Sequence, residues 1–449
     1  MMNTPVYDFI KEYAEKNTVR LHVPGHKGKA GEFCEAFDIT EIDGADVLYH
    51  ETGILAESQK NASAIFGTAK TVYSTEGSSL CIRAMLTLIK MLAVKNGRKP
   101  VIAAGRNAHK VFMIASALLD IEVQWIFPEN KNSVISADIS TGYLESFLDK
   151  KSELPTAVYI TSPDYLGNLS DIKGLAEVCH KRGVFLAVDN AHGAYLNFLH
   201  KNRHPIFLGA DICCDSAHKT LPVLTGGAYL HISETAPSEF RENAENAMSI
   251  FASTSPSYLI LASLDKVNEY LEYGFVQGLS ALIERLDTLK KNLISRGYSL
   301  IGNEPLKITV ATKCYGYKGF ELAEILRNNG IECEFYDPDY TVMMFTVNNS
   351  EDEISQVEKV LLSLEKKEEI SCIFPKNPIL SRKLSIKEAL FSPSEEIKTE
   401  DAVGRILASP SVTCPPAVPI AISGEELNEE AVKCFSYYGI EKINVIKEV

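Results

Sequence analysis

The sequence lacks the features that mark secreted, membrane-spanning and metal-binding proteins. Its ten cysteines are scattered and form no C-x-x-C pair, so neither a disulfide framework nor a zinc site is indicated. No run of 18 or more apolar residues occurs, which argues against a transmembrane helix, and the N-terminal stretch is amphipathic rather than a signal peptide. We therefore expect a cytoplasmic protein that keeps its cysteines reduced, contacts no membrane and binds no metal.

The sequence also has fewer basic than acidic residues and lacks the common nucleotide-binding motifs. The chain has 45 lysine and arginine residues against 59 aspartate and glutamate residues, a net charge of −14, whereas nucleic-acid binding needs basic patches. Neither G-x-x-x-x-G-K-S/T nor a G-x-G-x-x-G after a predicted strand occurs. We therefore expect no nucleic-acid partner, and any phosphate bound here belongs to another kind of cofactor or substrate.

Short apolar runs alternate with helical stretches between about residues 60 and 230. This alternation is typical of an α/β protein with a mostly parallel sheet covered by helices. In such sheets, ligands bind at the carboxyl ends of the strands. The predicted strands are 68–75, 99–105, 121–127, 156–163, 184–190 and 210–216, and the predicted helices are 79–96, 109–119 and 171–183.

The length of 449 residues exceeds what one hydrophobic core can hold. We expect a large domain with the N-terminal segment at 1–265, a smaller α+β domain at 266–365 and a small C-terminal domain at 366–449. A long helical stretch, from about Ser257 to Ser295, links the first two. The tail is rich in proline and charge, but apolar positions persist to its end, so we predict a folded domain there.

Two segments place polar residues at the ends of predicted strands. EGSS, residues 76–79, opens a helix with a glycine turn followed by serines, which suits an anion, although an ordinary helix cap has the same residues. Asp189 ends an apolar strand, where a carboxylate is costly unless it meets a cation or a hydrogen-bond donor. A protonated pyridine nitrogen, a metal or a helix end would satisfy it, and His192 either lines the same pocket or packs in the core.

The segment DSAHKTLPVLTGG, residues 215–227, follows the next apolar strand. Lys219 is a candidate Schiff-base lysine, because a desolvated lysine can act as a nucleophile. Ser216 and His218 are placed to bind a phosphate, although a lone loop lysine is usually only solvated. Together with Asp189 and the EGSS turn, these residues match the needs of pyridoxal phosphate (PLP), which are an aldehyde anchor, an acid at the ring nitrogen and a phosphate cup.

Two further histidine segments are less specific. His109, in AGRNAHK, lies at a strand-to-helix turn and either stacks on a flat cofactor ring or simply starts the helix. His22 and His26 have the spacing of a helical zinc pair, but Pro24 and Gly25 between them break any helix. We expect that stretch to form a turn near the site.

Taken in order, these segments resemble the ornithine/lysine/arginine decarboxylases of the bacterial, fold-type I kind, in the short form without an N-terminal wing domain. The S-x-H-K segment and the joint order are specific, whereas EGSS alone is weak. Departures from the family pattern at 386–389 and 415–417 leave the identity of the substrate open. The resemblance covers nearly the whole chain and rests on VPGHKGK, EIDGADVLYHETGIL, EGSS, GRNAHK, VDNAHGAY, DSAHKT, STSPSYLILASLD and PPAVPI…GEEL.

The resemblance implies a PLP site with assigned residues. Lys219 would hold the aldehyde of PLP, and Asp189 would pair with the pyridine nitrogen. His109 would stack on the ring, with His192 beside it. It also implies a homodimer or larger homo-oligomer, in which the segment 253–258 reaches the phosphate of the partner's site. The residues expected around the phosphate are Ser78, Ser79, Ser216 and His218, and the expected catalytic residues are Lys219, His109, Asp189 and His218.

The implied reaction is the PLP-dependent decarboxylation of a basic amino acid (arginine, lysine or ornithine) to carbon dioxide and an amine of the kind used in polyamine biosynthesis. The alternative is an aminotransferase or an aldolase-type lyase, because enzymes of this fold share the lysine and the aspartate. A non-catalytic protein with the same fold is disfavoured, since every position expected to bind the cofactor carries a suitable residue. The sequence does not identify the acid that binds the cationic end of the substrate, and Asp46 and Glu76 are among the candidates.

Overall fold

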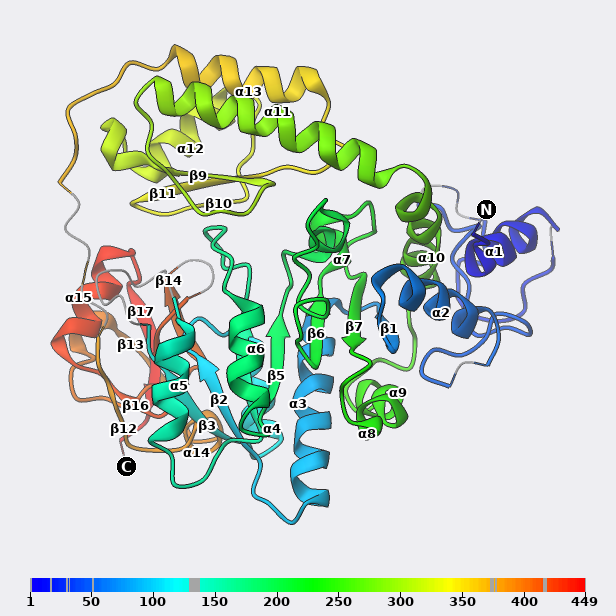
Figure 1. Cartoon of the computed structure of the whole chain (residues 1–449), viewed down its shortest axis with the longest axis horizontal. Helices are drawn as coiled ribbons and strands as arrows, with labels where there is room; N and C mark the ends of the chain where they lie inside the picture. Colours follow the sequence, from blue (N-terminus) through cyan, green and yellow to red (C-terminus); the bar gives the residue numbers. More distant parts are fainter. Residues whose placement is uncertain are drawn as a thin grey trace. The chain divides into compact units, whose positions relative to one another are not determined.

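The computed structural model of the chain describes residues 2–16, 18–29, 31, 33–50, 52–128, 138–371, 375, 378–414 and 418–448. The chain forms two compact units, one of Met1–Arg98 with Cys179–Ser280 and one of Lys99–Val178 with Ala281–Val449 (Figure 1). It crosses between them three times, after Arg98, within α6 (Ile172–His180) and within α11 (Phe275–Ser295). The three-domain division expected from the sequence stays a prediction.

The first unit contains four strands, β1 (Lys70–Ser74), β5 (Phe185–Asp189), β6 (Ile212–Asp215) and β7 (Ala228–Ile232). Their order is β1-β7-β6-β5. β5 and β6 run parallel, whereas β7 runs antiparallel to both of its neighbours. Nearly all of their residues are buried, as the continuous apolar runs in the sequence require.

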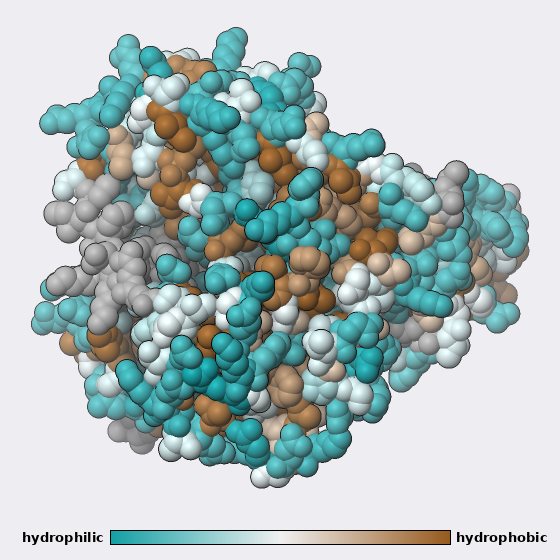
Figure 2. All heavy atoms as spheres, viewed as in Figure 1, coloured by the Kyte–Doolittle hydropathy of each residue, from teal (hydrophilic) through white to brown (hydrophobic). Residues whose placement is uncertain are grey.

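Helices of the first unit cover these strands, and α3 packs against β6 and β7. Among the described residues, α3 is the one helix long and apolar enough to span a membrane, but 61% of that stretch is buried, as in a core helix. Figure 2 shows hydrophilic side chains over much of the face in view, with hydrophobic patches between them. The helices are α1 (Pro5–Glu15), α2 (Ile54–Phe66), α3 (Gly77–Lys95), α7 (Ala217–Thr220), α8 (Ser238–Glu242), α9 (Ala244–Ser249), α10 (Tyr258–Tyr273) and the 3₁₀ helix η1 (Ala194–Phe198).

The second unit contains three parallel strands, β2 (Val101–Gly105), β3 (Glu122–Ile126) and β4 (Ala157–Thr161), in the order β4-β2-β3. Helix α4 (Lys110–Leu118) follows β2, and α5 (Thr141–Asp149) precedes β4. All six strands predicted between residues 60 and 230 are present, and β7 is the one antiparallel strand added to them. The α/β class with mostly parallel strands is therefore confirmed.

A smaller antiparallel sheet of the second unit has the order β10-β11-β9-β8, which confirms the α+β pattern expected in this region. The helical stretch predicted from Ser257 to Ser295 is two helices, because α10 ends at Tyr273 and Gly274 takes φ −166° and ψ −18° before α11 begins. Glycine leaves helical geometry more easily than other residues. The elements here are β8 (Leu300–Ile301), β9 (Lys307–Ala311), η2 (Thr312–Tyr315), α12 (Gly319–Asn328), β10 (Phe335–Tyr336), β11 (Tyr340–Met344) and α13 (Glu351–Ser363).

The C-terminal residues are folded, as predicted. Leu407, Phe435 and Val445 belong to a buried cluster that also includes Phe335 and Val342 of the smaller sheet. The departure at 386–389 lies in α14, and 415–417 lie outside the described residues. The elements are β12 (Ser381–Arg382), α14 (Ile386–Leu390), β13 (Ser394–Lys398), η3 (Thr399–Asp401), β14 (Ser411–Cys414), β15 (Val418–Ile422), β16 (Glu425–Glu426), α15 (Glu429–Tyr437) and β17 (Lys442–Ile446).

Candidate active site

Two glycine turns meet where β1 ends and α3 begins. The Gly77 amide donates to the Gly226 carbonyl at 2.7 Å, and both glycines have positive φ, +70° and +103°. A Cβ at Gly226 would lie 2.7 Å from the carbonyl oxygen of Thr75. A side chain at Gly226 would therefore push the two turns apart, which explains the glycine of the Thr-Gly-Gly segment.

Hydroxyl groups from distant parts of the sequence converge beside these turns. The Ser216 hydroxyl donates to the Ser78 hydroxyl at 2.8 Å, and Ser79 follows in the first turn of α3. The N-cap residue Glu76 makes no side-chain cap hydrogen bond, so its side chain does not satisfy the N–H groups at the start of α3. A helix N-terminus with hydroxyl groups suits a phosphate.

Lys219 lies on the short helix α7, which follows β6. Its Nζ is 3.0 Å from Nε2 of His192, a buried residue in the turn after β5. The structure thus brings together a lysine and a histidine that are 27 positions apart. At this distance one proton can pass between the two nitrogens.

His218 is fixed by the neighbouring Thr-Gly-Gly turn. Its Nδ1 lies 2.9 Å from the Gly227 carbonyl, which also accepts the backbone N–H of His218 at 3.1 Å. Burial lowers the pKa of His218, so its ring is neutral at pH 7. The Cε1 edge of the ring lies 4.0 Å from where a Cβ on Gly77 would be, which places His218 beside the glycine turns.

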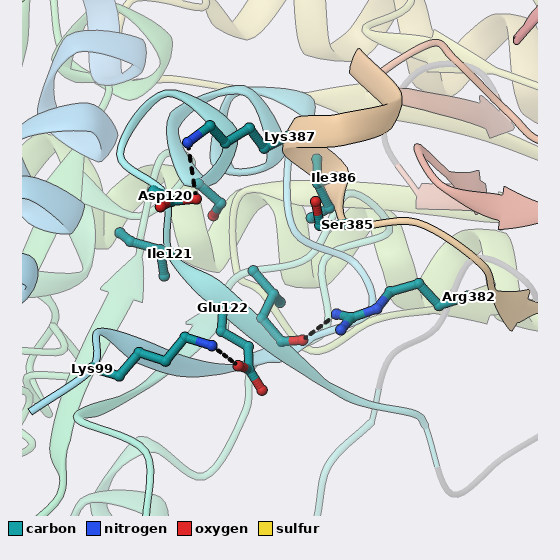
Figure 3. Close-up of a pocket in the computed structure, with 10 residues that line it drawn as sticks. Lys99, Asp120, Ile121, Glu122, Arg382, Ser385, Ile386 and Lys387 are labelled. Carbon is teal, nitrogen blue, oxygen red and sulfur yellow. Dashed lines mark hydrogen bonds and ion pairs between the residues drawn. The ribbon is translucent and has the colours of Figure 1, made fainter. Parts of the chain in front are cut away.

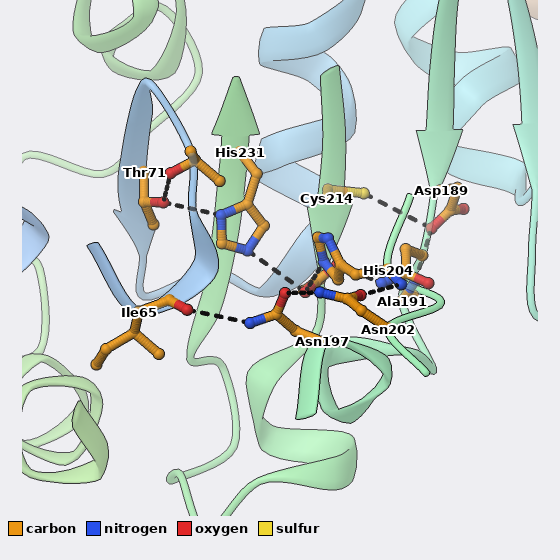
Figure 4. Close-up of polar contacts among 12 residues, drawn as sticks. Ile65, Thr71, Asp189, Ala191, Asn197, Asn202, His204, Cys214 and His231 are labelled. Atoms are coloured by element: carbon orange, nitrogen blue, oxygen red, sulfur yellow. Dashed lines mark hydrogen bonds and ion pairs between the residues drawn. The ribbon is translucent and has the colours of Figure 1, made fainter. Parts of the chain in front are cut away.

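Asp189 ends β5 and is buried. Its Oδ1 accepts the Ala191 N–H at 3.3 Å and the Cys214 thiol at 3.6 Å (Figure 4). These contacts fix the carboxylate at the ligand-binding edge of the strands. A carboxylate this buried suits a positively charged partner, which the nitrogen of a protonated pyridine ring would be.

His109 belongs to the second unit. It is the N-cap of α4, and its Nδ1 accepts the Val111 N–H at 3.3 Å. The helix-start interpretation is therefore correct for this histidine, and its stacking on a cofactor ring stays a prediction.

The two acids suggested for the substrate have other partners in the first unit. The Asp46 carboxylate accepts the backbone N–H groups of Val47, Thr52, Gly53 and Leu55. Partial burial opposes ionisation, but these hydrogen bonds outweigh it and lower the pKa of Asp46. Glu76 Oε1 accepts the Ser253 N–H at 2.7 Å. Asp46 therefore organises the loop before α2, and Glu76 positions the segment 253–258.

A buried polar network under the lysine was not predicted from the sequence. Asp215 is the last residue of β6. Its carboxylate lies 2.9 Å from His204 Nε2 and 3.3 Å from His231 Nε2, and it accepts the Asn190 side-chain amide at 2.7 Å. His231 Nδ1 lies 2.8 Å from the Thr71 hydroxyl (Figure 4). Asp215, like Asp189, is an acid at the end of an apolar strand, and that signal alone could have identified it.

The same three side chains have the composition of a metal site. The ligand atoms of His204, Asp215 and His231 lie within 4.8 Å of one another, and all three residues are buried. The shorter distances, 2.9 and 3.3 Å, are those of hydrogen bonds or ion pairs. Burial opposes ionisation of Asp215, but the two imidazoles outweigh it and hold its pKa well below the ordinary value. We therefore describe this group as a hydrogen-bonded network.

The chain is similar to known proteins over nearly its whole length. The sequence model of the family described as "Orn/Lys/Arg decarboxylase, major domain" matches residues 4–301. The chain is 28% identical to the uncharacterized protein YaaO of Bacillus subtilis, over 97% of this chain and 94% of that one. It is also 28% identical to the arginine decarboxylase of the same organism, over 96% and 92%. Among solved structures, the lysine decarboxylase of Francisella novicida has a TM-score of 0.81 at 15% identity, over 99% of this chain and 81% of that one.

Proposed function

Because the chain belongs to the Orn/Lys/Arg decarboxylase family, we propose that it removes the α-carboxyl group of arginine. It has the fold of the fold-type I PLP enzymes, uses PLP as its cofactor and decarboxylates a basic amino acid. The similarity to a protein named arginine decarboxylase over 96% of this chain supports arginine over lysine and ornithine. The product would then be an amine of the polyamine type, which suits a role in polyamine biosynthesis.

The residues of the first unit fit PLP. When bound, PLP supplies an aldehyde for the substrate amine and a ring that takes up the electron pair left by the departing carboxylate. We assign the phosphate to Ser78, Ser79, Ser216 and His218, because the two serine hydroxyls that meet at 2.8 Å lie at an uncapped helix N-terminus. The buried carboxylate of Asp189 is assigned to the ring nitrogen, since it would keep that nitrogen protonated.

The observation that carries the proposal is the contact between Lys219 and His192, 3.0 Å apart. Lys219 is the proposed covalent anchor for the aldehyde. Loss of carbon dioxide leaves a carbon that must gain one proton in its place. We assign that proton to Lys219 Nζ, with His192 Nε2 as the group that holds and returns it.

We also propose that the enzyme works in the cytoplasm as a homodimer or larger homo-oligomer. The N-terminal segment exposes Val19, Leu21 and Phe33, and we propose that contact with another copy of the chain buries them. A second copy of the chain is the partner that the active-site segment 253–258 would reach.

The test measures PLP binding and carbon dioxide release together. The purified protein is mixed with PLP, its visible absorbance is recorded, and carbon dioxide is counted with arginine, lysine and ornithine in separate tubes without any keto acid. We expect a cofactor band and carbon dioxide from arginine. Lys219→Ala should lose both, whereas Lys201→Ala, a matched change at an exposed lysine, should keep both.

Other outcomes change the proposal in defined ways. Carbon dioxide from lysine or ornithine alone would replace arginine as the substrate. A cofactor band without carbon dioxide from any of the three would contradict the proposal and lead to the aminotransferase alternative, which needs a keto-acid acceptor.

A further inference from the structure

A cavity of about 230 Å³ lies within the second unit, between the start of β3 and the segment around α14 (Figure 3). Helix α4, which packs against α14, contributes Ser116 to its lining. Two other lining residues, Ile386 and Lys387, belong to the stretch 386–389 that departs from the family pattern. None of the residues assigned to PLP lines this cavity, so we consider it as a second binding site.

The charged side chains of the cavity carry one positive charge in excess. Lys99 Nζ lies 2.8 Å from a carboxylate oxygen of Glu122, and Lys387 Nζ lies 3.2 Å from one of Asp120 (Figure 3). These two pairs compensate one another. The lining includes one further cation, the guanidinium of Arg382, and this excess charge favours an anionic ligand.

Arg382 is placed to hold such a ligand. Its Nη1 donates to the Val123 carbonyl at 3.4 Å, which is long for an N–H···O hydrogen bond. Glu388 on α14 accepts the Ser385 backbone N–H and hydroxyl at 2.8 and 2.7 Å. These hydrogen bonds lower the pKa of Glu388, and the charge of Arg382 adds to that effect. A guanidinium has five N–H donors, so Arg382 can also donate to an oxyanion in the cavity.

The hydroxyl of Ser116 is a second and independent sign of a ligand. Ser116 is only 1% exposed, and its Oγ has no hydrogen-bond partner within the part of the chain that the structure describes. Buried polar groups normally have partners. Because Ser116 lines the cavity, an oxygen atom of a ligand bound there would accept its hydrogen bond.

The cavity also has an apolar part, formed by Ile121, Val123 and Ile386. An inorganic ion would leave these side chains uncovered, whereas a short aliphatic group would pack against them. The volume is below the roughly 300–1,000 Å³ of pockets for drug-sized ligands. The cavity therefore suits a small molecule with one charged end and a short apolar part.

We infer that the cavity between β3 and α14 binds a small aliphatic carboxylate, whose carboxylate group meets Arg382 and Ser116 and whose apolar part lies against Ile121 and Ile386. The planar fork of an arginine side chain matches a carboxylate. A carboxylate carries the single negative charge that the excess positive charge of the lining requires. The inference goes beyond the proposed function, because this site is separate from the residues assigned to PLP.

Trp125 provides the readout. It is the single tryptophan of the chain and lies on β3, two positions after Val123 and thus on the same face of the strand. Its ring packs edge-on against Phe112 of α4, with ring centroids 5.9 Å apart. Phe112 lies one helical turn before Ser116, so a ligand at Ser116 should change the fluorescence of Trp125.

The test titrates the holoenzyme with butyrate at constant ionic strength and records the fluorescence of Trp125. We expect a saturable change with butyrate, none with n-butanol or chloride, and a higher half-saturating concentration for inorganic phosphate. Arg382→Gln should raise the half-saturating concentration of butyrate at least about 10-fold. Arg327→Gln, the same change at an exposed arginine outside the cavity, should leave it unchanged.

Ser116→Ala gives an independent test, because its hydroxyl has no described partner to lose. We expect it to raise the half-saturating concentration of butyrate about 3- to 10-fold without lowering the melting temperature. The inference is wrong if butyrate gives no saturable change, if phosphate binds more tightly than butyrate, or if either cavity variant binds butyrate like the wild type. Carbon dioxide release is not part of this readout, so failure of the inference is distinguishable from failure of the proposed function.

Discussion

Replacing Asp215 with alanine should remove a large part of the stability of the first unit. The side chain accepts from Asn190 and pairs with both His204 and His231 in a region that excludes water. Without it, three buried donors lose their acceptor. Each unsatisfied donor costs about 1–3 kcal/mol, or roughly 3–9 kcal/mol for three, and measured losses for a broken buried pair are about 3–5 kcal/mol. We therefore expect a loss of about 3–5 kcal/mol.

Asp211→Ala is the matched control. Asp211 also accepts from a histidine, His180, at 2.9 Å and from the Leu186 N–H at 2.8 Å. The His180 side chain is 41% exposed, so water replaces the lost acceptor, and only one buried donor stays unsatisfied. We expect a loss of about 1–3 kcal/mol.

Urea unfolding of the two holoenzymes, followed by far-UV circular dichroism at pH 7.5, measures this difference. The single tryptophan, Trp125, belongs to the second unit, so fluorescence would not report on the first. Equal losses in the Asp215 and Asp211 variants would refute the reasoning, because they would mean that the network contributes no more than a half-exposed pair.

The network also predicts how stability depends on pH. Burial lowers the pKa of His231 below 6.5, and the imidazoles hold the pKa of Asp215 below 3.8. In both cases the unfolded chain binds more protons than the folded chain, so the contribution of these two groups to stability is complete above pH 6.5 and falls on acidification. The loss should begin below pH 6.5 through His231 and continue below pH 3.8 through Asp215, and Asp215→Ala should abolish the second phase.

Two further predictions concern the second unit. Burial raises the pKa of Asp337 to about 7, so stability should fall as the pH rises from 4 to 7. Asp337→Asn should remove that fall, on the order of 2–4 kcal/mol, in unfolding curves at pH 5 and pH 8. Glu425→Gln should lower the free energy of unfolding by about 3–5 kcal/mol. Glu425 forms a buried bidentate ion pair with Arg106, with contacts of 2.9 and 2.7 Å. Glu332→Gln, at the exposed pair with Arg327, should leave the urea unfolding curve nearly unchanged, because water solvates both groups.

The parts of the site that were predictable are those whose chemistry is local in the sequence. Ser216, His218 and Lys219 follow one strand within four positions, and Asp189 ends another, so strand ends alone indicate a shared edge. The network of Asp215 was not predictable in this way. His231 reaches it because β7 pairs antiparallel with β6, and strand pairing is not encoded in a local pattern.

The role of Asp46 also could not be predicted from the local sequence. An acid in a glycine-containing loop is compatible with substrate binding, and the sequence does not distinguish that role from loop organisation. Only the path of the backbone brings four N–H groups onto its carboxylate. The break at Gly274 is similar, because a helical pattern continues through it on both sides and a single glycine is often tolerated within a helix.

The position of Lys219 depends on groups outside its own helix. α7 has four residues, far below the roughly 12–15 residues that an isolated helix needs for stability, so it cannot hold a lysine in place by itself. Its start is fixed by the Asp215 network and by the Ser216–Ser78 contact, and its middle by the two contacts of His218 with Gly227. Since a reacting group must be held to within about 0.5 Å, loss of Asp215 should disturb Lys219 as well as the core. The Asp215→Ala enzyme should therefore release PLP at urea concentrations at which its circular dichroism is still that of the folded protein.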